Sequence, residues 1–135
     1  MFTKKPSKPQ NRIDSLIGAG TRIEGSVIFS GGLRIDGEVK GDVVASTEQP
    51  STVVVSEQAR IEGEVRVSHM VINGTVVGHV HATDFLELQP RSRVTGDIHY
   101  TNLEIQLGAV VEGRLVHAAA GGEAKAVELK LAKGN

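Results

Sequence analysis

Residues 33–43 read LRIDGEVKGDV and contain the short pattern on which the fold prediction depends. In Val39-Lys-Gly41-Asp-Val43, two aliphatic residues flank a central glycine, and one residue of any type separates each of them from it. The same pattern recurs around six glycines: Gly25, Gly41, Gly63, Gly78, Gly96 and Gly113. Successive glycines are 16, 22, 15, 18 and 17 residues apart. Self-similarity at a nearly constant spacing is typical of a repeat protein.

A second set of aliphatic residues keeps the same spacing. It consists of Leu33-x-Ile35, Val53-x-Val55, Met70-x-Ile72, Leu86-x-Leu88 and Leu103-x-Ile105. We expect Leu16 to begin this set in the first repeat, with Gly18 in place of the second aliphatic residue. The longest repeat contains residues 46–51, whose Thr-Glu-Gln-Pro indicates an inserted turn. Two independent sets with one period are hard to obtain by chance.

Apolar residues alternate within each repeat, which indicates strands and not helices. A repeat this short cannot bury its apolar side alone and must stack on its neighbours. The sequence therefore predicts an all-β, single-domain parallel β-helix of about six rungs. We place this domain at residues 15–117, with the six glycines at or near one bend of the coil.

Composition narrows the classes of function. The 135 residues include no cysteine, which excludes disulfides and thiolate metal sites and fits a reducing cytoplasm. Only 3% of the residues are aromatic, whereas small-molecule pockets usually depend on aromatic side chains. No apolar run approaches the ~18 residues of a membrane span, and the N-terminus lacks a signal-peptide core. The formal net charge of −1 gives no general attraction to nucleic acid.

The N-terminal tail, residues 1–14, is basic and is predicted to be disordered. An apolar tip and nearby lysines form a candidate weak anchor for an anionic membrane surface. These candidate membrane-binding residues are Met1, Phe2, Lys4, Lys5 and Lys8. The alternative is a tail that only increases solubility. Polymerisation would favour the anchor, because many weak anchors on one rod bind with avidity.

The C-terminal segment, residues 118–135, is rich in Ala, Gly and Lys and is expected to be mostly disordered. Within it, Val127, Leu129 and Leu131 alternate with charged residues, which would also suit a short capping strand. Such a strand would close an end that polymerisation needs open.

Histidines raise the question of a metal site. In the aligned repeats, His81 and His99 share one outward column, and His79 and Asp97 share the next. The first column continues with Arg66 and Val116, so no third ligand is evident, and a surface ladder of polar groups is the favoured interpretation. Neither a nucleophile elbow nor a phosphate-binding loop occurs in the sequence. We therefore expect no enzyme activity, no cofactor and no metal.

The repeated I-x-G-x-V pattern, the run at residues 33–43 and the short start MFTKK together resemble the bactofilins. The resemblance implies a right-handed parallel β-helix that assembles into non-polar filaments without nucleotide. It also implies a membrane-targeting tail, matched here by Met1, Phe2, Lys4 and Lys5, and a scaffold role in cell shape or organelle placement. The expected location is then the cytoplasmic face of the inner membrane, with unidentified envelope or cell-shape proteins as partners.

Physical reasoning leads to self-association by another route, because the end of a solenoid exposes strand edges and apolar core. The candidate polymerisation residues are Leu16, Ile23, Val27 and Phe29 in the first rung and Leu103, Ile105, Val111 and Leu115 in the last. If like ends meet, the filament has no overall polarity.

A left-handed β-helix enzyme is the rival interpretation, either an acyltransferase or a zinc-dependent γ-type carbonic anhydrase. Residues 17–25, IGAGTRIEG, superficially resemble the hexapeptides of those proteins. A sustained six-residue period is absent, however, and bound zinc or a discrete trimer would be needed to favour this alternative.

Overall fold

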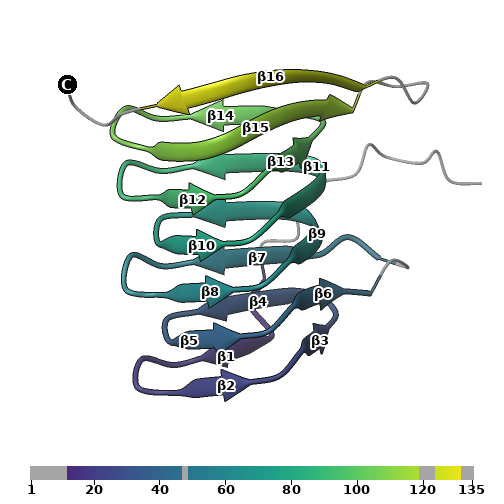
Figure 1. Cartoon of the computed structure of the whole chain (residues 1–135). Helices are drawn as coiled ribbons and strands as arrows, with labels where there is room; N and C mark the ends of the chain where they lie inside the picture. The colour runs from purple at the N-terminus through teal and green to yellow at the C-terminus, as the bar shows by residue number, and fades with distance from the viewer. Residues whose placement is uncertain (1–11, 47–48, 119–123, 132–135) are drawn as a thin grey trace, which may run out of the picture.

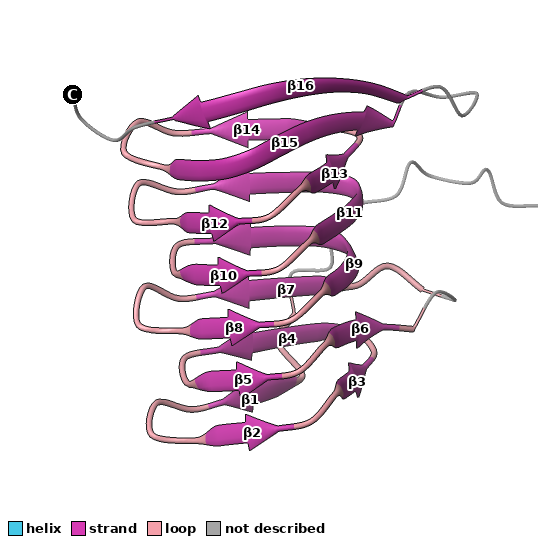
Figure 2. Ribbon diagram, in the orientation of Figure 1, coloured by secondary structure: helices cyan, strands magenta, loops and turns pink. Residues whose placement is uncertain are grey.

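The computed structural model describes residues 12–46, 49–118 and 124–131, and for residues 124–131 only the backbone. This part of the chain forms sixteen strands and no helix (Figures 1 and 2). None of its elements is a helix that could cross a membrane. The strands wind into a parallel β-solenoid of six rungs, and each rung places one strand segment on each of three faces. The predicted fold class is confirmed.

The three faces are stacks of equivalent strands. Face 1 consists of β1 (Ser15–Ile17), β4 (Gly32–Ile35), β7 (Thr52–Val55), the second halves of β9 (Val65–Ile72) and β11 (Val80–Leu88), and β14 (Leu103–Ile105). Face 2 consists of β2 (Arg22–Glu24), β5 (Glu38–Lys40), β8 (Arg60–Glu62), β10 (Thr75–Val77), β12 (Arg93–Thr95) and the first part of β15 (Val110–Ala118). Face 3 consists of β3 (Val27–Phe29), β6 (Val43–Ala45), the first parts of β9 and β11, β13 (Ile98–Tyr100) and the end of β15. The last strand, β16 (Ala124–Leu131), runs antiparallel to β15 and follows the sixth rung.

Residues one rung apart face each other in register, so the aliphatic residues of each repeat form continuous columns inside the coil. On face 2 the inward column is Ile23, Val39, Ile61, Val76, Val94 and Val111. From Val39 onwards its members are at most 1% exposed. The alternation read from the sequence is therefore the alternation between core and solvent.

The first rung departs from the predicted register by one residue. Leu16 pairs with the outward Arg34 and is 60% exposed, whereas Ile17 pairs with Ile35 and is 7% exposed. The prediction that Leu16 begins the inward set is wrong. Asp14 accounts for the shift, because its backbone N–H donates to the Gly32 carbonyl at 2.9 Å and its carboxylate accepts the Gly32 N–H at 3.0 Å. In a strand, a shift of one residue exchanges the inner and outer faces.

The six repeat glycines stack at the bend between faces 2 and 3, as predicted. At Gly63, φ is +158°, and a Cβ atom there would lie 2.1 Å from the carbonyl oxygen of Gly41 in the preceding rung. The same approach recurs at each later glycine of the column, at 2.1–2.3 Å. Gly25 belongs to the first rung and has a φ of +135°, but no atom of the described residues lies within 4 Å of the position its Cβ would take. Close stacking of the rungs thus requires glycine at every position from the second rung onwards.

The insertion at residues 46–51, of which the structure describes 46 and 49–51, begins and ends at the corner between faces 3 and 1. On its near side, the Ser46 N–H donates to the Phe29 carbonyl at 2.8 Å. On its far side, the Thr52 N–H donates to the Gly31 carbonyl at 3.0 Å. Because both bonds reach back to the first two rungs, the extra residues do not disturb the register.

Replacing Ile61 by Asp should unfold the rod. Ile61 is 0% exposed, so the new carboxylate would be buried without a partner, at a cost above about 4 kcal/mol. Glu62→Ala is the matched control, because it removes only a solvated surface pair with Arg60 and should change stability little. Thermal melts compare the two variants, and equal melting temperatures would contradict the rung register.

Replacing Gly63 by Ala should destabilise the protein more than replacing Gly25 by Ala. Both substitutions strain a positive φ, but only Gly63→Ala also drives a methyl group into the backbone of the preceding rung. Overpacking of that kind adds ~1–3 kcal/mol to the loss. Chemical denaturation of monomeric protein measures both variants, and an equal loss would show that the glycine is needed for its φ alone.

Candidate functional site

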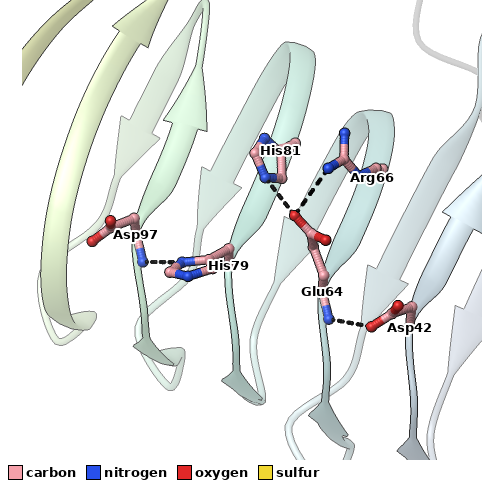
Figure 3. Close-up of polar contacts among 6 residues, drawn as sticks. All are labelled: Asp42, Glu64, Arg66, His79, His81 and Asp97. Carbon is pink, nitrogen blue, oxygen red and sulfur yellow. Dashed lines mark hydrogen bonds and ion pairs between the residues drawn. The ribbon is translucent and has the colours of Figure 1, made fainter.

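A column of polar side chains follows the glycines along the outside of the rod. Each of three members accepts the backbone N–H of the next rung. Asp42 accepts from Glu64 at 2.9 Å, His79 from Asp97 at 3.0 Å and Asp97 from Arg114 at 3.1 Å (Figure 3 shows the first two). The Arg114 guanidinium also donates to Asp97 at 3.0 Å, and the two bonds from Arg114 hold the pKa of Asp97 below its usual value. This surface ladder of polar groups was predicted, but its use of backbone donors was not.

His81 and His99 are neighbours in register on face 3, as the repeat alignment predicts. Their rings stack with centroids 4.5 Å apart and an interplanar angle of 12°. His81 Nε2 lies 2.8 Å from Glu64 Oε2, which Arg66 also contacts at 3.2 Å (Figure 3). Partial burial, helped by His99 and Arg66, lowers the pKa of His81 despite the contact with Glu64. Near neutral pH the contact is therefore a hydrogen bond from a neutral imidazole.

The described side chains include no group of three or more His, Asp or Glu placed to share a metal ion. Stacked imidazoles direct their faces, and not their nitrogen lone pairs, toward each other. The neighbours of this pair along its column are Arg66 and Val116, as the sequence indicated.

A serine–histidine pair that sequence analysis did not single out lies beside the insertion. Ser68 Oγ is 3.2 Å from His69 Nδ1, and Ser68 also lines a pocket of about 330 Å³ together with Ser51, Arg66 and His81. The Ser68 hydroxyl, however, donates its proton to the Ser51 carbonyl at 2.7 Å. His69 is therefore not positioned to remove that proton, and the pair holds the insertion against the rod.

Among the described residues, nothing covers the strands at the N-terminal end of the rod. Strands β1, β2 and β3 each pair only with the second rung in the part of the chain that the structure describes. Of the predicted interface residues, Ile23 and Val27 are half-buried, Leu16 is exposed, and Phe29 is 9% exposed. Two further exposed aliphatic residues, Ile13 and Ile28, lie in or beside this rung. The repeat pattern did not predict Ile28 as an interface residue, because it occupies an outward position, opposite Val44.

The C-terminal end differs, because β16 lies over β15 (Figure 1). The pairing runs from Val111 opposite Leu131 to Ala118 opposite Ala124 and so covers faces 2 and 3. Val111 and Leu115 are 0% and 6% exposed beneath this strand. On face 1, where β14 pairs only with β11 among the described residues, Leu103 and Ile105 remain half-buried.

Strand β16 lies in the segment expected to be mostly disordered, and it includes residues 127–131, for which the alternation suggested a capping strand. The candidate membrane-binding residues Met1, Phe2, Lys4, Lys5 and Lys8 lie outside the described residues, so their role stays a prediction.

Residues 15–116, which contain all six rungs, match the family profile described as "Bactofilin: Polymer-forming cytoskeletal". The chain belongs to the bactofilin family. It is 28% identical over 116 residues to Bactofilin BacP of Myxococcus xanthus (strain DK1622), covering 85% of this chain and 47% of BacP. It is also 28% identical over 102 residues to Bactofilin BacO of the same organism, covering 76% of this chain and 78% of BacO. The chain thus spans about half the length of BacP. No solved structure matches it.

The family match agrees with the geometry of the bactofilin rod, whose six rungs coincide with the matched residues. Because the family is described as polymer-forming, the two ends of the solenoid are the candidate surfaces for contact between copies. The resemblance stated from the sequence is confirmed.

Proposed function

We propose that this bactofilin is a scaffold and not an enzyme, and that its rods join end to end into non-polar filaments without nucleotide. The observation that carries the proposal is the open first rung, where three strand edges and several aliphatic side chains lack a covering neighbour among the described residues. Exposed strand edges and apolar surface together favour pairing with another chain.

The sides of the rod are less suited to association than its ends. On face 2 the outward residues of the first three rungs are charged, and oppositely charged residues are paired within a rung, Arg22 with Glu24 and Arg60 with Glu62. These pairs are exposed and well solvated, and burying them would cost more than it returns. The first rung, by contrast, offers unpaired strand edges and aliphatic side chains that a second copy can pair with and cover.

Contact between like ends is the favoured geometry. A two-fold axis at the first rung would bring the same residues together from both copies, so that each unpaired edge meets another. Alternating like-end contacts then produce a filament without polarity.

We further propose that residues 1–8 hold the filament at an anionic membrane surface, on the cytoplasmic side of the inner membrane. Lysines near such a surface contribute ~1 kcal/mol each, which is weak for one chain. A filament carries many tails and therefore binds with avidity. A membrane-bound polymer would recruit envelope or cell-shape proteins as its clients.

Ile23→Lys should abolish filaments while leaving the fold intact. Ile23 is half-buried at the open rung, so the ammonium group can reach water in a monomer but would be buried against a second copy. Val76→Lys, in the same column at 0% exposure, is the matched control and should unfold the rod. Negative-stain electron microscopy, sedimentation and thermal melts distinguish the outcomes. Filaments of normal length from folded Ile23→Lys protein would exclude the first rung as a contact.

Removing the N-terminal tail should release filaments from membranes without shortening them. Deletion of residues 1–8, or Phe2→Ser with Lys4→Ser and Lys5→Ser, removes both the apolar tip and the charges. Lys40→Ser with Lys133→Ser, outside both the N-terminal tail and β16, is a control that loses two lysine charges, as the Ser variant does. Co-sedimentation with anionic liposomes measures binding. Undiminished binding of the deleted chain would place the membrane contact elsewhere.

A further inference from the structure

The two ends of the rod differ in how far their last strands are covered, because strand β16 covers part of the C-terminal end. Every pairing between rungs is parallel, whereas β16 adds to the last rung in the antiparallel direction. It is therefore not a seventh rung. It is a hairpin partner of β15, joined to it by the short segment at residues 119–123.

The burial of the last rung follows the path of β16. Val111 and Leu115 on the covered faces are buried, whereas Leu103 and Ile105 on the uncovered face are half-exposed. In the first rung, which no described strand covers, the counterparts of Val111 and Leu115 are Ile23 and Val27, and both are only half-buried. On faces 2 and 3, the backbone edge and apolar core that would meet a second copy at this end are thus already in use.

We propose that β16 is an internal competitor for the C-terminal assembly surface, so that this end accepts another copy only after β16 leaves β15. The inference rests on the proposed end-to-end assembly and adds its regulation. Its consequence is an ordered assembly in which the open N-terminal ends join first and the C-terminal ends join after displacement of β16.

Competition of this kind is strong but reversible. A short linker keeps β16 at an effective concentration on the order of millimolar, roughly 10³ above a micromolar concentration of a second copy. An equally good strand from another molecule would therefore lose to β16. Yet β16 pairs with only β15 among the described strands, and an edge strand with one partner is among the first elements to open.

A disulfide lock tests whether β16 must leave. Glu112 and Lys130 are directly opposed, and opposed residues of an antiparallel pair have Cα atoms ~4.5–5.5 Å apart, within the range of a disulfide. The chain contains no cysteine, so Glu112→Cys with Lys130→Cys introduces the only thiols. The oxidised protein should form particles no larger than two chains, and adding Ile23→Lys should reduce them to monomers. The same protein in dithiothreitol, and Glu112→Cys alone, serve as controls.

A variant that weakens the pairing of β16 with β15, the release variant, tests whether loss of β16 promotes assembly. In an antiparallel ladder, alternate residues donate to the partner strand, so one of Val127 and Glu128 must donate to β15. Val127→Pro with Glu128→Pro removes that bond and should increase filament length at least about tenfold at equal concentration, if the millimolar competitor is lost. Lys133→Pro with Gly134→Pro, beyond the end of β16, is the matched control and should leave the length unchanged.

Electron microscopy and analytical ultracentrifugation of these full-length variants decide the question. Filaments from the oxidised lock as long as those of the release variant would overturn the competition while leaving end-to-end assembly intact. Monomers from the reduced, locked and release proteins alike would instead overturn end-to-end assembly itself, and the competition with it.

Discussion

The backbone contact between glycines of successive rungs is the constraint on which the rest of the rod depends. Strands in neighbouring rungs can pair along all three faces only if the bend between faces 2 and 3 allows the backbones to approach. A Cβ atom at Gly96 would lie 2.3 Å from the Gly78 carbonyl oxygen, which no side chain can tolerate. The glycine repeat in the sequence thus follows from a backbone contact that recurs once per rung. This contact sets the spacing of the rungs, and the aliphatic columns fill the interior between them.

The fold could be predicted because both of its requirements are local in sequence. Glycine marks the bend, and the alternation of Val, Ile and Leu marks the inward side of each strand. The register of the first rung could not be predicted in this way, since Leu16 and Ile17 are adjacent aliphatic residues and either could face inward. Two hydrogen bonds between Asp14 and Gly32 decide between them, and these residues are in contact only after the second rung has formed.

The same distinction applies to the candidate site. Repeat alignment placed His79 and Asp97 in one outward column but could not show that His79 Nδ1 accepts the Asp97 backbone N–H. Alternation at residues 127–131 indicated a strand, whereas its partner and direction follow from a hairpin that no periodicity encodes. Residues whose role is set by the neighbouring rung are readable from the repeat. Residues whose role depends on the ends of the rod are not, because the ends are where the repeat stops.

A repeat protein has no intrinsic length, since each interior rung accepts another on either side. What limits growth is the chemistry of the two terminal surfaces, and in this chain they differ in kind. Gly25 keeps the positive φ of its column although no rung precedes it among the described residues, so the first rung retains the conformation of a rung on which another can stack. The last rung has instead received an antiparallel strand, which satisfies its edge without offering the parallel geometry of a further rung. The N-terminal end of the rod thus resembles an interior rung that lacks a neighbour. The C-terminal end is instead closed on faces 2 and 3 by a strand that is not a rung.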